Sequence, residues 1–170
     1  SNPGIDLTKI GLVGYSWGGL AATVLAGKIP DIGCIVSLEG SEFHHYGAAK
    51  EEDADFDSLR YKTPFTNLHL KIPYLRLETA PGPNTVHQDS VYNFREKLSG
   101  TTQIFTIAGA KHEDFGCLSK VVRQAGNCDE TSYYQTVERI TVAFLDEQLN
   151  KSHEFSRLVE AENNKTFIKK

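Results

Sequence analysis

The sequence contains no methionine, only three cysteines and a single tryptophan among its 170 residues. It has no apolar run near the roughly 18 residues that a membrane-spanning helix requires, which excludes a span of that kind. No basic segment followed by an apolar one opens the chain, so no secretory signal peptide is recognisable. Acidic residues outnumber basic residues 22 to 18, which argues against the basic face of a nucleic-acid-binding domain.

The missing methionine also bears on the N-terminus, since an intact translation product begins with methionine and this chain begins with Ser1. We therefore expect this terminus to arise from processing, from proteolysis or from the choice of the expressed segment. The remaining composition is that of a globular domain. Apolar residues make up 39% and charged residues 24%, values that exclude wholesale disorder.

Four short apolar segments predict buried strands, at residues 9–14, 33–38, 73–77 and 103–108. Helices are expected at residues 17–28, at 91–98 and after Ser132, which forms a capping box with Gln135. The apolar side of that last helix carries Val137, Ile140 and Phe144. This alternation predicts an α/β fold with a mainly parallel sheet of about four strands flanked by helices.

Two segments fall outside this alternation. Residues 41–70 have no steady period, and they are expected to form an insertion that either caps the site or is a solvated excursion. Residues 150–170 are polar, and they are expected to be a C-terminal tail or a weak helix through Phe155, Leu158 and Val159.

The segment GYSWGG, residues 14–19, fits the pattern G-x-S-x-G between a predicted strand and a predicted helix. Glycines 14 and 18 are expected to remove Cβ atoms that would collide with backbone on a tight turn. The turn exposes the Ser16 hydroxyl and leaves the Trp17 N–H at a helix N-terminus. Ser16 is the candidate nucleophile and Trp17 a candidate oxyanion-hole donor. A turn that only packs, or one that binds phosphate, is the alternative, although the Gly-Lys-Ser/Thr of a P-loop is missing.

Residues 6–19, DLTKIGLVGYSWGG, resemble the nucleophile strand and elbow of the α/β-hydrolase superfamily. The nearest resemblance is to dienelactone-hydrolase-like and platelet-activating-factor-acetylhydrolase-like esterases. It extends over about residues 5–149 and is most specific at the elbow and around residue 112. Dienelactone hydrolases carry cysteine at the elbow, whereas serine here points to the esterase and lipase side. The resemblance implies a serine hydrolase of carboxylic esters that needs no cofactor and no metal.

A serine hydroxyl attacks only when a base takes its proton, so a histidine is required. In hydrolases of this fold the order along the chain is serine, acid, histidine, with the histidine beyond the last strand. His112, in the segment AGAKHEDFG, follows the predicted strand at 103–108 and is the candidate base. The other histidines fit this order less well; they are His44, His45, His69, His87 and His153.

The acid has more than one candidate. The commonest family position, after the strand at 73–77, holds no aspartate, and Glu78 and Asp89 are the carboxylates nearest to it. The other family position is the end of the strand beside the nucleophile strand, where Glu39 lies 23 residues after Ser16. In a parallel sheet both strand ends open into one crevice, so Glu39 is the preferred acid. A solvated strand-end residue remains the alternative for Glu39.

The three cysteines do not decide whether the protein resides in an oxidising or a reducing compartment. Cys34 is expected to be a small buried hydrophobe within a strand. Cys117 and Cys128 bracket the loop after His112, and a disulfide between them would imply a secreted or periplasmic protein. Two free thiols in a cytoplasmic enzyme are an equally good interpretation.

The nucleophile strand is the first of the four predicted strands, whereas in the resembled superfamily it is the fifth of about eight. The resemblance therefore implies that residues 1–149 are the C-terminal portion of a hydrolase domain, with the missing N-terminal half as partner and a small-molecule ester as substrate. The second oxyanion donor belongs to that half, so the chain alone is expected to be inactive or weakened. The alternatives are a non-catalytic hydrolase-like binding module and a serine peptidase of the same fold.

Overall fold

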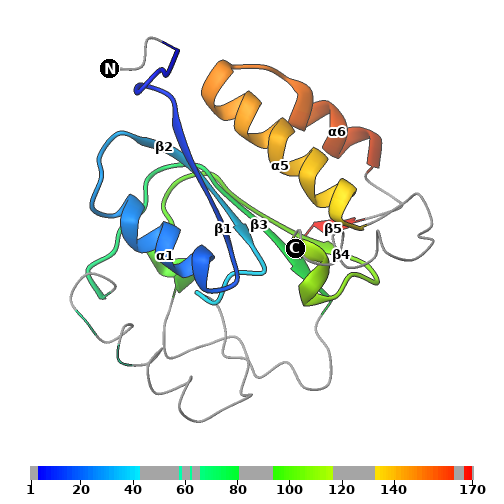
Figure 1. Cartoon of the computed structure of the whole chain (residues 1–170), viewed down its shortest axis with the longest axis horizontal. Coiled ribbons are helices and arrows are strands. Elements are labelled where there is room, and N and C mark those ends of the chain that lie inside the picture. The colour runs from blue at the N-terminus through cyan, green and yellow to red at the C-terminus, as the bar shows by residue number, and fades with distance from the viewer. Residues whose placement is uncertain are drawn as a thin grey trace.

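A computed structural model of the chain describes residues 4–42, 58, 62, 66–80, 94–116, 133–162 and 167–169. Its centre is a five-stranded sheet in the order β1-β2-β3-β4-β5 (Figure 1). The first four strands are parallel, and β5 is antiparallel to β4. The strands are β1 (Ile10–Tyr15), β2 (Ile32–Leu38), β3 (Tyr74–Thr79), β4 (Thr102–Ile107) and β5 (Phe167–Lys169).

Helices cover both faces of this sheet. Helix α1 (Trp17–Ala26) lies on one face, and α5 (Tyr133–Asn150) lies on the other, with α6 (Glu154–Glu162) packed against it (Figure 1). Two short 3₁₀ turns complete the described elements, η1 (Phe94–Lys97) and η2 (His112–Phe115). The predicted fold class, a mainly parallel α/β sheet flanked by helices, is confirmed.

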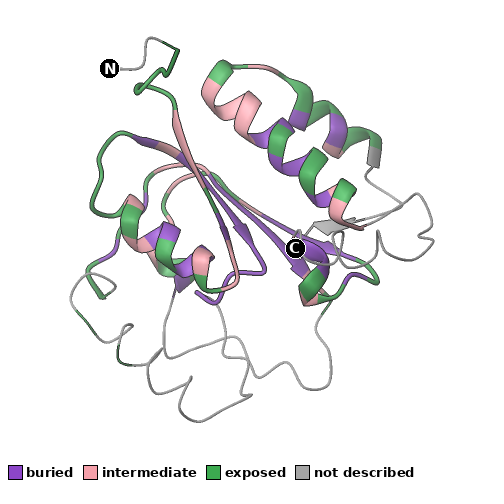
Figure 2. Cartoon of the chain, in the orientation of Figure 1, coloured by how far each residue is buried: buried purple, intermediate pink, exposed green. Residues whose placement is uncertain are grey.

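The core consists of one apolar cluster on each face of the sheet, because successive strand residues point to opposite faces. On β2, Cys34 and Val36 belong to the cluster under α5, whereas Ile35 belongs to the cluster under α1. Figure 2 shows the resulting burial of the central strands. The predicted apolar side of α5 is buried, and Val137, Ile140 and Phe144 all lie in the cluster beneath it.

The structure differs from the expected helix at 91–98 in its described part. Phe94–Lys97 form a 3₁₀ turn, and Leu98 instead pairs with Leu70 in a β-bridge. The Leu70 N–H donates to the Lys97 carbonyl at 2.7 Å, and the Ser99 N–H donates to the Leu70 carbonyl at 2.8 Å. These bonds fix Leu98 in an extended backbone, so a contact with a segment distant in sequence overrides the helical spacing of the apolar residues.

The C-terminal segment holds more structure than a polar tail. Helix α6 buries Phe155 and Leu158, the residues that the sequence marks as the apolar side of a weak helix. Strand β5 then pairs with Phe105–Ile107 of β4, a contact that no sequence pattern predicts. Several predicted features lie outside the described residues, namely Asp89, Val91, Cys117, Cys128, Ser132 and most of the segment 41–70.

Candidate active site

The elbow residue Ser16 lies between the end of β1 and the start of α1, with φ 55° and ψ −120°. A positive φ is rare outside glycine and costs conformational energy, so surrounding contacts must hold it. The Ser16 N–H donates to the Leu38 carbonyl at 3.0 Å, and the Ser16 carbonyl accepts from Gly19 N–H at 3.0 Å and Ser41 N–H at 3.1 Å. The candidate nucleophile is therefore fixed by α1 and by the segment after β2.

The glycines of the elbow have different roles from those expected. A Cβ on Gly14 would lie 2.1 Å from the Gly18 carbonyl oxygen, so the prediction of a forbidden Cβ is correct at this position. The same prediction is wrong at Gly18, because a Cβ there would meet nothing within 4 Å. The second restricted position is Gly19, where a Cβ would lie 2.7 Å from the Gly40 Cα. The first turn of α1 thus packs against the segment after β2 through Gly19, while Gly18 faces outward.

Glu39 follows β2 directly and is itself in the left-handed region, with φ 48°. Its side chain is buried, and both carboxylate oxygens accept hydrogen bonds from Thr79 at the end of β3. The Thr79 N–H donates to Oε2 at 2.7 Å, and the Thr79 hydroxyl lies 3.2 Å from Oε1. The Glu39 N–H donates to the Leu77 carbonyl at 2.8 Å, which ties the residue to β3 through its backbone as well.

The charge of Glu39 is set by opposing influences. Burial raises the pKa of this carboxyl above its ordinary value, the positive charge of Arg76 and the Thr79 hydrogen bonds lower it, and the negative charge of Glu78 raises it. Because the net shift is upward, ionised Glu39 is costly to the folded protein. Glu39 is therefore not the solvated strand-end residue of the alternative interpretation.

Glu78, one of the alternative acids, has a different partner. Its Oε2 accepts a hydrogen bond from Arg76 Nε at 2.6 Å, and its side chain is 10% exposed. Asp89, the other alternative, lies outside the described residues.

His112 opens the 3₁₀ turn η2 beyond β4, where the sequence places the candidate base. Asp114 stabilises this turn, since its Oδ2 accepts the Lys111 N–H at 3.0 Å. Phe115 anchors the same turn, because its ring is buried in the cluster under α5. The His112 ring lies on the Tyr15 ring with centroids 4.8 Å apart and an interplanar angle of 31°. The residue before Ser16 therefore touches the candidate base.

The protonation of His112 suits a base. Burial lowers the pKa of its imidazole below the ordinary value, and the negative charge of Glu113 offsets this only in part. At neutral pH the ring is mostly neutral and can accept a proton.

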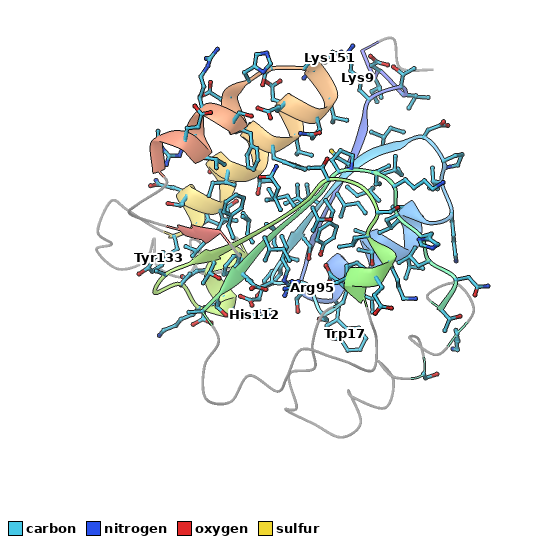
Figure 3. All side chains as sticks on the ribbon, turned by 180° about the vertical axis from the view of Figure 1, so that it is seen from behind. Lys9, Trp17, Arg95, His112, Tyr133 and Lys151 are labelled. Atoms are coloured by element: carbon cyan, nitrogen blue, oxygen red, sulfur yellow. The ribbon has the colours of Figure 1, made fainter. Side chains whose placement is uncertain are left out.

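Ser16, Glu39, Thr79 and His112 all follow, or end, one of the four parallel strands. The carboxyl ends of parallel strands meet at one edge of the sheet, which is the usual place for a site in an α/β fold. In Figure 3, His112 and Trp17 lie toward this end, and Lys9 and Lys151 lie at the opposite end. Trp17 is the first residue of α1, and its side chain is 47% exposed.

Three residues at or beneath this edge were not predicted from the sequence: Tyr15 and Thr79 at the strand ends, and Arg76 within β3. Arg76 carries the clearest signal, because a charged residue inside the apolar segment YLRLET contradicts a strand covered on both faces. Tyr15 and Thr79 carry no such signal, since both are common residues at strand ends. Across the described ranges, no three His, Cys, Asp or Glu side chains are grouped closely enough to hold a metal ion. Nor is any described helix both long and apolar enough to cross a membrane.

A comparison with protein families gives an independent assignment. Residues 1–113 match the family described as BAAT / acyl-CoA thioester hydrolase C terminal, and the matched range includes Ser16, Glu39 and His112. A search among curated proteins found no significant match. The matched residues are about two thirds of the chain and span the four parallel strands. The chain belongs to the BAAT / acyl-CoA thioester hydrolase C-terminal family, whose members have the α/β-hydrolase fold.

Proposed function

We propose that this chain carries the catalytic triad of a serine hydrolase that cleaves acyl thioesters or carboxylic esters. Ser16 is the nucleophile, His112 the general base and Glu39 the acid. The observation that carries the proposal is the elbow: Ser16 is held in a strained conformation between a parallel strand and a helix, beside a turn that presents Glu39. Membership in a family of acyl-CoA thioester hydrolases supports the reaction class.

The reaction proceeds in two acyl transfers. His112 takes the Ser16 hydroxyl proton as Oγ attacks the carbonyl carbon, and the thiol or alcohol leaves with that proton to give an acyl-serine. Water then attacks the acyl-serine, with His112 again moving the proton, and the carboxylic acid is released. Glu39 orients the imidazole and stabilises its charged form. The Trp17 N–H, at the start of α1, donates to the oxyanion.

A second oxyanion donor is expected from outside the chain. Among the described strands, β1 lies at the edge of the sheet, and its residue Val13 is 47% exposed. An uncovered strand edge is a ready site for further pairing. We propose that an N-terminal part of the same hydrolase domain covers this edge and supplies the donor. Activity is therefore measured in the full-length protein, because loss of one such donor costs about 10²–10³-fold in rate.

The esterase subgroup and the choice between ester and thioester are also part of what we propose. The resemblance to dienelactone-hydrolase-like and acetylhydrolase-like esterases remains a prediction, as does the preference for carboxylic esters over thioesters. The family description favours a thioester, so paired acyl substrates that differ only in a sulfur or oxygen leaving atom are the appropriate assay. The ratio of their kcat/KM values, corrected for the uncatalysed rates, measures the preference.

The nucleophile is tested with a fluorophosphonate probe, which labels activated serines. We expect the full-length protein to be labelled at Ser16 and the Ser16→Ala variant to lose labelling and about 10⁴–10⁶-fold of its hydrolytic rate. Ser152, which lies between α5 and α6, is the matched control, and Ser152→Ala should be labelled normally. Undiminished labelling of Ser16→Ala would remove the nucleophile assignment and leave the non-catalytic alternative.

The acid is tested by ranking two isosteric variants. Glu39→Gln should lower kcat by about 10³–10⁴-fold, because the amide cannot stabilise an imidazolium. Glu78→Gln should lower it less than about tenfold, since Glu78 bonds Arg76 and is not assigned to the base. The reverse order would transfer the role to Glu78. A peptidase of the same fold shares this triad, and cleavage of a peptide amide faster than of the matched thioester would favour that alternative.

A further inference from the structure

A buried ion-pair cluster lies beneath the candidate site and has no role in the mechanism above. Its centre is Arg76 on β3, whose side chain is 0% exposed. Alternate residues of a strand share a face, so Tyr74, Arg76 and Glu78 all point toward the α1 side of the sheet. Glu42, from the segment after β2, completes the cluster and is also fully buried.

Arg76 makes contacts in three directions. Its Nε donates to Glu78 Oε2 at 2.6 Å, and its Nη1 lies 3.7 Å from Glu42 Oε1. The same Nη1 donates to the Gly40 carbonyl at 2.8 Å. The Tyr74 hydroxyl donates to Glu42 Oε1 at 2.5 Å. The Arg76 guanidinium therefore contacts the 39–42 turn at Gly40 and at Glu42 through Nη1, while its Nε bonds Glu78.

The 39–42 turn needs such support. Glu39 has a positive φ, and a Cβ on Gly40 would lie 2.2 Å from Glu42 Oε2 and 2.3 Å from Ser37 Oγ, so the turn is tightly packed. The turn also reaches the nucleophile, because the Ser41 N–H donates to the Ser16 carbonyl at 3.1 Å. Any shift of the Gly40 carbonyl would thus move both Glu39 and the backbone that holds Ser16.

Stability alone does not explain a buried arginine at this position. Desolvation of the charges offsets most of what a buried ion pair gains, and apolar side chains of similar volume often replace such pairs without loss of stability. Ile104 pairs with Arg76 across β3 and β4 and is buried in the apolar cluster under α1, so apolar side chains already border this position. The contact that an apolar residue cannot reproduce is the charged hydrogen bond to the Gly40 carbonyl.

We propose that Arg76 is a positioning residue that fixes the 39–42 turn and, through it, the orientation of the Glu39 carboxylate toward the base. The proposal rests on the assignment of Glu39 as the triad acid. Arg76 takes no part in making or breaking bonds, and its effect on the reaction passes through Glu39.

The electrostatics of the cluster agree with this role. Among the described residues, the charged and hydrogen-bonding groups that act on Glu39 include Arg76, Glu78 and Thr79 from β3, and Glu39 in turn acts on Tyr15 from β1. Of the charged groups, Arg76 lowers the pKa of the Glu39 carboxyl and Glu78 raises it. Burial would lower the pKa of Arg76, but the negative charges of Glu42 and Glu78 raise it overall, so Arg76 stays charged. The positive charge that favours ionised Glu39 is therefore permanent.

A double-mutant cycle tests the proposal in the full-length protein. Lysine at position 76 keeps the charge but cannot bond Glu78 and the Gly40 carbonyl together. We expect Arg76→Lys to lower kcat about 10²-fold with little change in KM, because misplacement by about 1 Å has that effect. In the Glu39→Gln background the same substitution should lower kcat less than about threefold, since there is no acid left to position.

The controls separate this effect from a loss of folded protein. The matched control is Arg157→Lys, because Arg157 is an exposed arginine on α6 that lies 3.6 Å from Glu154. This substitution should leave kcat unchanged in both the parent and the Glu39→Gln background. If Arg76→Lys does not fold, the triple variant Arg76→Met, Glu78→Met and Glu42→Gln removes all the charges of the buried cluster together and enters the same cycle. This variant should fold, and it should lose kcat in the parent background but not in the Glu39→Gln background.

Three results have distinct meanings. A loss of kcat on Arg76→Lys that is large in the parent background and small in the Glu39→Gln background supports the positioning role. A loss of equal size in both backgrounds, or full activity of a folded Arg76 variant, overturns it while the triad assignment stands. Full activity of Glu39→Gln overturns the acid assignment itself, and the positioning role with it.

Discussion

At the scale of single residues, the proposed acid Glu39 shows how a catalytic role would conflict with stability. Its carboxylate is buried, its backbone is in the left-handed region, and burial raises its pKa. The left-handed backbone is strained in either protonation state, and burial destabilises the folded protein when Glu39 is ionised. A buried carboxylate with a shifted pKa is typical of a functional site rather than of a packing position. The Thr79 hydrogen bonds and the Arg76 charge offset part of the cost.

This conflict predicts that Glu39→Gln stabilises the protein while it removes activity. A group whose pKa is raised in the folded state contributes most to stability below its ordinary pKa, about 4.3, and loses that contribution as pH rises through the folded pKa. Glutamine does not titrate and can still accept the Thr79 N–H. We therefore expect Tm at pH 7 to rise by about 2–4 °C and the gain to vanish below about pH 4.

Thermal unfolding followed by circular dichroism from about pH 3.5 to 8 measures this difference, since that range spans the ordinary carboxyl pKa. Glu154→Gln, at an exposed position on α6, is the matched control and should show no comparable pH-dependent gain. A Glu39→Gln variant that is less stable than the parent at pH 7 would contradict the assigned direction of the Glu39 pKa.

At the scale of elements, the strand-to-helix turn depends on where two backbones approach. Gly14 lies against the Gly18 carbonyl, and Gly19 lies against Gly40, so β1, α1 and the 39–42 turn are joined by contacts that leave no room for a side chain. Gly18 has no such neighbour within 4 Å. The motif therefore holds one glycine that the geometry requires and one that the fold of this chain does not.

The two positions give opposite predictions. Gly14→Ala forces backbone atoms apart, and we expect a loss of about 1–3 kcal/mol of stability together with roughly a tenfold or greater loss of probe labelling at Ser16. Gly18→Ala places alanine in an open helical position and should gain up to about 0.8 kcal/mol, because glycine is the poorer helix former. Urea denaturation of the two variants measures the stabilities side by side. Equal destabilisation by both would show that the elbow constrains Gly18 as well.

At the scale of the whole molecule, a line of aromatic rings joins the sheet to its outer helices. Phe105 on β4 packs edge-on against Phe155 of α6, with centroids 6.1 Å apart. Phe155 in turn packs against Phe144 of α5 at 5.2 Å, again nearly perpendicular. All three rings are buried in one cluster with Phe115, which anchors the His112 turn. The packing of α5 and α6 therefore also supports the turn η2, which carries the candidate base His112.

This arrangement predicts a large effect of one α5 side chain and a small effect of its neighbour. Phe144→Ala should cost about 3–5 kcal/mol, a substantial part of the stability of a domain of this size. Val142, two residues away and 59% exposed, should tolerate alanine within about 0.5 kcal/mol. Urea denaturation of both variants is the measurement. A loss below about 1 kcal/mol for Phe144→Ala would show that the cluster does not act as one unit.

Much of the architecture could be predicted because it depends on local patterns. Apolar runs marked the four parallel strands, and the spacing of Val137, Ile140 and Phe144 marked the buried side of α5. The elbow could be found because a strained strand-to-helix turn requires glycine at a specific place. The 3₁₀ turn at Phe94–Lys97 could not, because the bridge between Leu70 and Leu98 joins segments that are remote in sequence.

The sequence by itself determined the α/β class, the position of Ser16 and the place of His112 beyond β4, because hydrophobic periodicity and turn chemistry act between near neighbours. Only the tertiary structure decided the environment of Glu39, the pairing of Glu78 with Arg76 and the contact between the Tyr15 and His112 rings. These contacts depend on which strands become neighbours and on how deeply a charge is buried. Burial and charge pairing between distant segments exist only once the sheet has formed, so the sequence alone does not reveal them.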